Sequence, residues 1–390
     1  MWNRIAGGGV TSAPGFRAAS ISAGIRYQGR DDLALVVADG PCAVAGVFTS
    51  NRAQAAPVIL SRQHVAGGTG RAVVVNAGCA NCGTGAGGLE DARAMAAAAG
   101  RALDCPPEQV VVCSTGTIGP RLPMDRVLPA IAGAAGRLSR DGAAVAKAIM
   151  TTDTRSKEAA ASDGRFTIGG MCKGVGMIHP NMATMLAFVT SDAAVPAQAL
   201  RPIVKRVADR TFNMVTVDGD ESTNDTFVVM CGGKAGTSDL DAFEAGLTMV
   251  CTDLAKQMAA DGEGATRLLE VVVAGAASEA DARKAARAVT ASSLVKTAVF
   301  GKDANWGRIL CAIGYSGAEF NVEDVDLAVG DIPVAAKGVE VPFDEGAVSA
   351  ALGGDVVRFD IRLGRGPGRA TSWGCDLSYD YVKINGSYRT

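Results

Sequence analysis

Regularly spaced hydrophobic residues predict several amphipathic helices in this chain. Apolar side chains recur three and four positions apart in 200–207 and in 243–258, which is the spacing of one helix face. Residues 90–103 are rich in alanine and begin with two carboxylates, which favour the N-terminal turn of a helix. A serine followed three residues later by an aspartate predicts the cap of a further helix over 278–289.

Other apolar runs have the length and composition of strands. Residues 73–75, 110–113 and 268–273 are short, rich in β-branched residues and typical of buried strands. Residues 356–363 and 376–384 alternate between apolar and polar positions, as strands with one buried face do. Because helices and strands are mixed throughout, the predicted fold class is α/β or mixed α+β.

The length of the chain predicts two domains. Its 390 residues exceed what one small core usually holds. We place the boundary near Gly275, where the predicted strand 268–273 ends and a new helix begins. The sequence contains no internal repeat and no low-complexity linker.

Composition argues against several classes of partner. With a formal net charge of -2, 48% hydrophobic and 20% charged residues, the chain offers no basic surface for nucleic acid or acidic membranes. Residues 1–9 lack the apolar core of a signal peptide, and no apolar run is long enough to span a bilayer. We therefore expect a cytoplasmic protein with no nucleic-acid or membrane partner.

Cysteine and histidine give weak signals for chemistry. The ten cysteines lack the spacing of a disulfide framework. Cys79 and Cys82 form a lone CxxC without a second pair or a nearby histidine, which favours buried thiols over a zinc site. His64 lies in a polar stretch and is expected at the surface, and His179 has no serine or cysteine motif to serve. We expect no metal and no histidine-based triad.

The tract 173–188 is the most informative part of the sequence. A loop interrupted by glycine and proline leads to Ala183 and Thr184, and the apolar run 185–189 follows at once. This order predicts a tight bend just before a buried strand. If the bond before Thr184 were cut, its hydroxyl and its own α-amine would supply a nucleophile and a general base in one residue.

Three further loops carry candidate polar groups. The sequence Ser-Thr-Gly-Thr at 114–117 follows a strand and is either an oxyanion-stabilising turn or an ordinary one. Glu263 lies between two glycines, where its carboxylate could meet a substrate ammonium or simply belong to a turn. The acidic loop 218–225 lacks the residue order of an EF-hand, which favours a tight connection between strands over a metal site.

Motifs along nearly the whole chain are similar to those of one enzyme family. They are 46–52, 114–119, 150–154, 173–188, 217–226, 262–266, 303–308 and 373–385. In this order they resemble the ornithine acetyltransferase family of arginine biosynthesis, also called glutamate N-acetyltransferase (ArgJ). The resemblance implies a self-cleaving, layered sandwich of sheets covered by helices, with a smaller C-terminal α/β domain.

The resemblance also implies two chains and a set of site residues. Cleavage between Ala183 and Thr184 would give an α chain, 1–183, and a β chain, 184–390, of which 184–274 completes the main domain and 275–390 forms the smaller one. Thr184 would be the nucleophile, and Thr115 and Gly116 would hold the oxyanion. The implied substrate contacts are Thr151 or Thr152, Lys173, Thr184, Glu263, Asn385 and Thr390. The choice between the two neighbouring threonines stays open, with the first preferred.

By the same resemblance, the reaction moves an acetyl group from N2-acetylornithine to glutamate without a cofactor. Acetyl-CoA as a co-substrate is left open, and the processed chains are expected to assemble as α2β2. Two alternatives remain: an N-terminal-nucleophile amidohydrolase or aminopeptidase that uses Thr184, and a non-catalytic amino-acid-binding protein. The chain departs from the family pattern at 79–83 and at His179, where a small residue is common.

Overall fold

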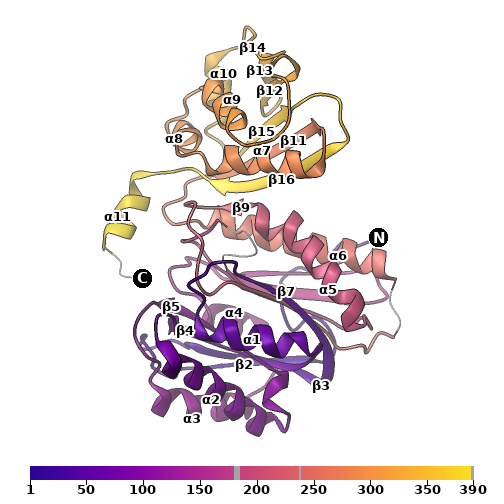
Figure 1. Ribbon diagram of the computed structural model, residues 1–390, viewed down its shortest axis with the longest axis vertical. Coiled ribbons are helices and arrows are strands. Elements are labelled where there is room, and N and C mark those ends of the chain that lie inside the picture. The colour runs from indigo at the N-terminus through magenta and orange to yellow at the C-terminus, as the bar shows by residue number, and fades with distance from the viewer. Residues whose placement is uncertain (180–184, 237–238, 388–390) are drawn as a thin grey trace.

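The computed structural model describes residues 1–179, 185–236 and 239–387. Figure 1 shows an elongated molecule with one β-sheet toward each end. Helices α5 (Ala197–Arg210) and α6 (Leu240–Ala260) lie between the two sheets, and α6 contacts strands of both.

The larger sheet contains nine strands of the described residues, in the order β1-β6-β7-β8-β10-β3-β4-β5, with β2 paired to β3. The strands are β1 (Asn3–Arg4), β2 (Phe16–Ile21), β3 (Leu33–Phe48), β4 (Thr69–Cys79), β5 (Val110–Thr117), β6 (Lys157–Ser162), β7 (Thr167–Lys173), β8 (Leu186–Ser191) and β10 (Thr226–Cys231). Strands β4 and β5 pair in parallel, as do β8 and β10. Strands β7 and β8 precede and follow the predicted cleavage site and are antiparallel neighbours.

Helices cover both faces of this sheet. Helices α5 and α6 share one core with β8 and β10, and the remaining helices of this half pack in the two other cores of the sheet (Figure 1). The latter are α1 (Ala56–Ala66), α2 (Gly85–Leu103), α3 (Met124–Ala135) and α4 (Gly142–Ala148), with a 3-10 turn, η1 (Pro107–Gln109). Strand β8 is buried on both sides: Ala187 and Val189 pack in the core that contains α5 and α6, while Leu186 and Phe188 pack in the core that contains α4. A strand covered on both faces reads as a continuous apolar run.

The second sheet has seven strands of the described residues, in the order β14-β13-β12-β15-β11-β16-β9. They are β9 (Val215–Thr216), β11 (Leu268–Ala276), β12 (Asp326–Val329), β13 (Ile332–Ala336), β14 (Val339–Glu340), β15 (Val356–Arg362) and β16 (Gly368–Cys375). Its helices are α7 (Glu279–Ala291), α8 (Ser293–Gly301), α9 (Trp306–Gly314) and α10 (Glu345–Ala351), and η2 (Phe212–Met214) and η3 (Val322–Asp324) are 3-10 turns. One hydrophobic core continues from the larger sheet through α6 into this sheet.

Most elements predicted from hydrophobic spacing are confirmed. Helices α5, α6 and α7 and strands β4, β5, β11 and β15 lie where the pattern placed them. Ser278 caps α7, because its side chain accepts a hydrogen bond from the Asp281 backbone N–H. The mixed α/β class is confirmed as well.

One predicted element is wrong, and another begins earlier than predicted. Residues 376–384 do not form a strand: β16 ends at Cys375, and the chain then forms helix α11 (Tyr379–Ser387). None of the described residues of α11 is buried, and Val382 is 70% exposed. Helix α2 covers the predicted helix 90–103 but begins earlier, at Gly85.

The division into domains stays a prediction. The structure differs from it in one respect, the sheet to which strand β11 belongs. We placed 268–273 before the boundary at Gly275. The structure joins β11 to the second sheet, since β11 pairs with β15 in parallel and with β16 antiparallel.

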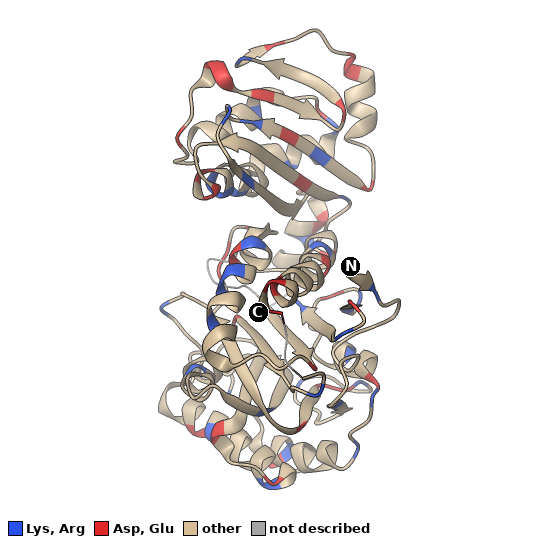
Figure 2. Ribbon diagram, turned by 90° about the vertical axis from the view of Figure 1, so that its right-hand side faces the viewer, with Lys and Arg blue, Asp and Glu red and all other residues tan. Residues whose placement is uncertain are grey.

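In the view of Figure 2, Lys and Arg residues are interspersed with Asp and Glu residues in both halves of the molecule. Among the residues that the structure describes, no helix is both long and apolar enough to cross a bilayer.

Candidate active site

A cavity of about 270 Å³ brings together groups from both halves of the chain. Its walls include seven of the predicted site residues: Thr115, Gly116, Thr151, Thr152, Lys173, Glu263 and Asn385. They come from the end of β5, the loop after α4, the end of β7, the turn after α6 and helix α11. Only the folded chain makes these five segments neighbours.

Thr115 and Gly116 lie at the C-terminal end of strand β5. Lys173 Nζ donates a hydrogen bond to Thr115 Oγ1 over 3.1 Å. An ammonium group is a donor only, so the hydroxyl of Thr115 accepts from it and keeps its own hydrogen for another acceptor. Gly116 has φ +129, and a Cβ there would lie 2.3 Å from the Gly78 carbonyl carbon. Glycine is therefore required beside this hydroxyl.

Lys173 is enclosed at the end of β7. Burial lowers the pKa of its ammonium, while the negative charge of Asp153 opposes that shift. A lysine with a lowered pKa inside a cavity is a common feature of functional sites.

A buried ion triad lies close to this lysine. Lys157 Nζ lies 2.7 Å from Asp153 Oδ1 and 2.6 Å from Asp261 Oδ2. Asp153 also accepts hydrogen bonds from the backbone N–H groups of Gly174, at 2.8 Å, and Thr151, at 3.1 Å. The triad thus ties the predicted threonine loop to the end of β7.

Glu263 faces the cavity from the turn after α6. Asn385 Nδ2 of α11 donates a hydrogen bond to Glu263 Oε2 over 2.9 Å. Among the described residues, no hydrogen bond occupies the other carboxylate oxygen. A Cβ at Gly176 would lie 2.5 Å from this carboxylate, so the close approach requires glycine. One side of the cavity can therefore bind an ammonium, and the other can bind a carboxylate or an oxyanion.

Comparisons with known proteins show the family of this chain. The sequence profile of the ArgJ family matches residues 17–390. The chain is 53% identical to the "Arginine biosynthesis bifunctional protein ArgJ" of Symbiobacterium thermophilum, over 98% of this chain and 99% of that protein. The chain belongs to the ArgJ family.

Further relatives carry similar names. The ArgJ protein of Dehalococcoides mccartyi is 47% identical over 98% of both chains. A solved structure, the arginine biosynthesis bifunctional protein ArgJ of Bacillus halodurans, is 46% identical and has a TM-score of 0.49; it covers 51% of this chain and 97% of its own.

Three of the predicted residues of this ArgJ-family chain, Ala183, Thr184 and Thr390, lie outside the described residues. Both Thr151 and Thr152 line the cavity, so the choice between them stays open. In the part of the chain that the structure describes, no group of three or more histidine, cysteine or carboxylate side chains has the geometry of a metal site.

Sequence reasoning missed two residues of the loop 218–225, which it interpreted as a tight connection between strands. Asn224 Nδ2 donates to the carbonyl oxygens of Ala80, at 2.6 Å, and Ser114, at 2.9 Å, and so holds the strand end that carries Thr115. Burial raises the pKa of Asp225 well above its usual value, and its Oδ2 has no hydrogen-bond partner among the described groups. The one signal for these two residues in the sequence was that they lie within the motif 217–226, which resembles the family pattern.

His179 is only partly exposed, and it contacts strand β9 and helix α7 of the second sheet. Its Nδ1 lies 3.1 Å from Thr216 Oγ1, and its Nε2 lies 3.0 Å from Arg287 Nη2 of α7. Burial and the nearby guanidinium lower the pKa of His179 to about 4. A neutral ring with Nε2 as acceptor fits these contacts.

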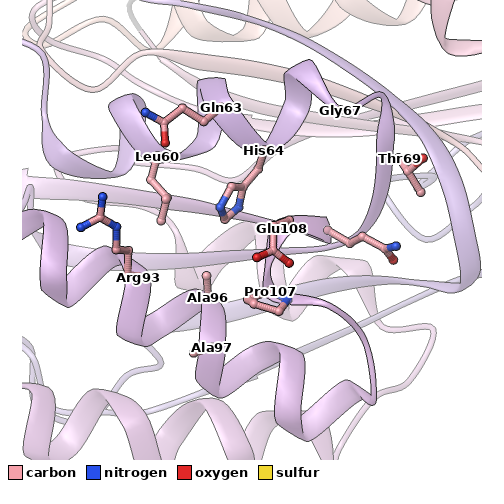
Figure 3. A pocket seen from close by; sticks show the side chains of 11 residues that line it. Leu60, Gln63, His64, Gly67, Thr69, Arg93, Ala96, Ala97, Pro107 and Glu108 are labelled. Carbon is pink, nitrogen blue, oxygen red and sulfur yellow. The ribbon is translucent and has the colours of Figure 1, made fainter.

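A larger cavity of about 730 Å³ lies between α1 and α2 (Figure 3). It contains none of the predicted site residues. His64 in its wall is half-buried, with Nδ1 2.8 Å from the Val110 carbonyl oxygen, rather than at the surface as expected. Cys79 and Cys82 are buried and unbonded to each other, as predicted.

Proposed function

We propose that this chain cleaves itself between Ala183 and Thr184 and then transfers an acetyl group from N2-acetylornithine to glutamate. The observation that carries the proposal is a single cavity holding both the Lys173–Thr115 pair and the Glu263–Asn385 pair. The first pair suits an oxyanion and the second suits an amino-acid ammonium.

Self-cleavage begins when Thr184 Oγ attacks the Ala183 carbonyl carbon. The peptide C–N bond breaks and an ester forms, while the proton of the hydroxyl passes to the departing amine. Water hydrolyses the ester and leaves Thr184 with a free α-amine. An α-amine titrates near about 7.7–8.0, so a modest downward shift leaves it neutral and basic near neutral pH.

In the transfer reaction, the α-amine takes the proton of its own hydroxyl, directly or through water. Thr184 Oγ then attacks the acetyl carbonyl carbon, and Thr115 and Gly116 stabilise the oxyanion. The bond between the acetyl carbon and the ornithine nitrogen breaks, and the ornithine amine leaves with the proton. The α-amine of glutamate attacks the acetyl ester, which gives N-acetylglutamate and regenerates Thr184.

The sheet supports a lasting association of the two product chains. Strand β7 precedes the cut and β8 follows it, and the two are hydrogen-bonded from Lys173–Leu186 to Ile168–Ser191. Separation of the chains would expose the edges of both strands in the middle of the sheet. We propose that the processed chains stay together and assemble as α2β2, which the mass of the native particle tests.

Two measurements test the reaction. Denaturing mass spectrometry is expected to find two chains, 1–183 and 184–390; a stable whole chain overturns self-cleavage. Purified protein is expected to release more than one equivalent of ornithine per chain from N2-acetylornithine only when glutamate is present. Repeated release without glutamate, with acetate as the second product, would instead indicate an amidohydrolase. Thr184→Ala is expected to abolish both cleavage and release.

We propose acetyl-CoA as a second acetyl donor, because the relatives are named bifunctional. Glutamate with acetyl-CoA is then expected to yield free CoA thiol and N-acetylglutamate. Protein that uses N2-acetylornithine but releases no thiol would restrict the chain to the transfer reaction.

A further inference from the structure

The chain that leads to the predicted cleavage site is held by one carboxylate. Asp218 Oδ2 accepts the backbone N–H of Met177 over 2.6 Å, and Asp218 Oδ1 accepts that of Ile178 over 2.8 Å. Asp218 Oδ1 also accepts the N–H of Asp220 at 3.2 Å, which fixes the carboxylate in its own loop. Charged acceptors make stronger hydrogen bonds than neutral ones.

The residue held in this way has an uncommon backbone conformation. Met177 has φ +57, which side chains with a Cβ rarely adopt. Neighbouring contacts keep the same segment in place: the Val217 N–H donates to the Ile178 carbonyl over 2.7 Å, and the Glu263 N–H donates to the Val175 carbonyl over 2.8 Å. Backbone outliers of this kind persist where the surroundings hold them and are frequent at functional sites.

The loop of Asp218 also contacts the chain just after the predicted site. The Thr226 N–H donates to the Met185 carbonyl over 2.8 Å, and Thr226 pairs in register with Leu186. The Asp218 carboxylate therefore holds residues 177 and 178 before Ala183–Thr184. Thr226 holds residues 185 and 186 after it through backbone pairing in the sheet.

We propose that Asp218 is a positioning residue for self-cleavage, holding Met177 in its left-handed conformation so that the chain approaches Ala183–Thr184 in the reactive direction. The role rests on the proposed function. Asp218 acts through the backbone of 177 and 178 and takes no part in bond making. After cleavage the same carboxylate remains in the cavity wall.

Asp218→Asn tests the role with little change of shape. An amide presents one acceptor and one donor where two N–H groups need two acceptors. Asp192→Asn is the matched control: Asp192, like Asp218, accepts a backbone N–H, that of Thr167 at 2.7 Å, but it is buried in another loop. Each precursor is made by cell-free synthesis and sampled over time by denaturing mass spectrometry, and melting temperatures are compared.

Asp218→Asn is expected to cleave at least tenfold more slowly than Asp192→Asn at a similar melting temperature. Adding Met177→Gly to Asp218→Asn is expected to raise the cleavage rate at least threefold over Asp218→Asn alone, because glycine adopts positive φ without the hydrogen bonds from Asp218. If Asp218→Asn does not fold, Met177→Val tests the same bend, since a β-branched residue resists positive φ; it is expected to slow cleavage.

The outcomes separate the two proposals. A wild-type precursor that stays whole overturns self-cleavage itself and this role with it. Wild-type cleavage together with an equally fast Asp218→Asn, or an equally fast Met177→Val, overturns only the role of Asp218. Slow cleavage that Met177→Gly does not relieve assigns Asp218 to general stability instead of positioning.

Discussion

Asn385, in the last helix, donates its side-chain amide to the Glu263 carboxylate over 2.9 Å, across a sequence separation of 122 residues. This bond occupies one carboxylate oxygen of a residue that lines the cavity, and among the described residues no hydrogen bond occupies the other. We expect Glu263→Gln to raise KM for N2-acetylornithine about 10- to 100-fold, because a hydrogen bond to a charged group contributes about 1.5–3 kcal/mol. Steady-state kinetics measure the effect, and mass spectrometry should show unimpaired cleavage.

The control is Glu279→Gln, which removes an exposed carboxylate paired with Arg210 on the surface. Its kinetics should match wild type. Unchanged kinetics in Glu263→Gln would remove Glu263 from substrate binding.

The hydroxyl of Thr115 should matter for rate more than for binding. Lys173 orients this hydroxyl, and a donor aimed at an oxyanion acts mainly in the transition state. Thr115→Ala is expected to lower kcat about 10²- to 10³-fold with KM nearly constant. Thr115→Ser keeps the hydroxyl and should retain most of the rate. Equal kcat values for the alanine and serine variants would contradict the oxyanion role.

The buried triad around Lys157 should dominate local stability. Its ammonium neutralises two buried carboxylates, Asp153 and Asp261, and its side chain is fully buried. Removing one partner of a buried pair leaves uncompensated charge, which costs about 3–5 kcal/mol. We expect Lys157→Met to lower the free energy of unfolding by that amount, measured by urea denaturation of the uncleaved Thr184→Ala chain.

Lys205 provides the comparison for this measurement, since it pairs with Asp209 on the exposed face of α5. Exposed pairs contribute about 0–1 kcal/mol, so Lys205→Met should have little effect. Similar losses in both variants would argue against a special role for the triad.

His179 should make stability depend on pH. Burial and Arg287 lower its pKa in the folded chain to about 4, below its usual 6.5. Well above pH 6.5 the ring is neutral in both the folded and the unfolded chain, so its titration does not change the free energy of unfolding. As the pH falls from 6.5 to 4 the unfolded chain takes up the proton first, so stability is lost over that window.

We expect this titration to remove about 2 kcal/mol between pH 7 and pH 4.5, allowing for solvent screening of the partly exposed ring. His179→Gln has no such titration, so the difference between the two unfolding curves isolates the histidine in the Thr184→Ala background. Parallel pH profiles for the two proteins would contradict the lowered pKa.

The sequence by itself determined most elements of secondary structure and the set of residue types for the chemistry. Hydrophobic spacing located α5, α6 and β11 because each buries a wide apolar face, and local patterns encode such faces directly. The pattern failed at α11, whose alternating residues have no sheet to cover them. Motif order, independent of packing, indicated the family.

Only the tertiary structure decided which residues become neighbours. The pairing of Glu263 with Asn385, the contact of Lys173 with Thr115 and the hold of Asp218 on Met177 each join segments distant in sequence. No local pattern specifies such contacts, because they depend on how sheets and helices pack. The acidic loop 218–225 reads as a plain connection in the sequence, and packing makes its carboxylate and amide the supports of the site.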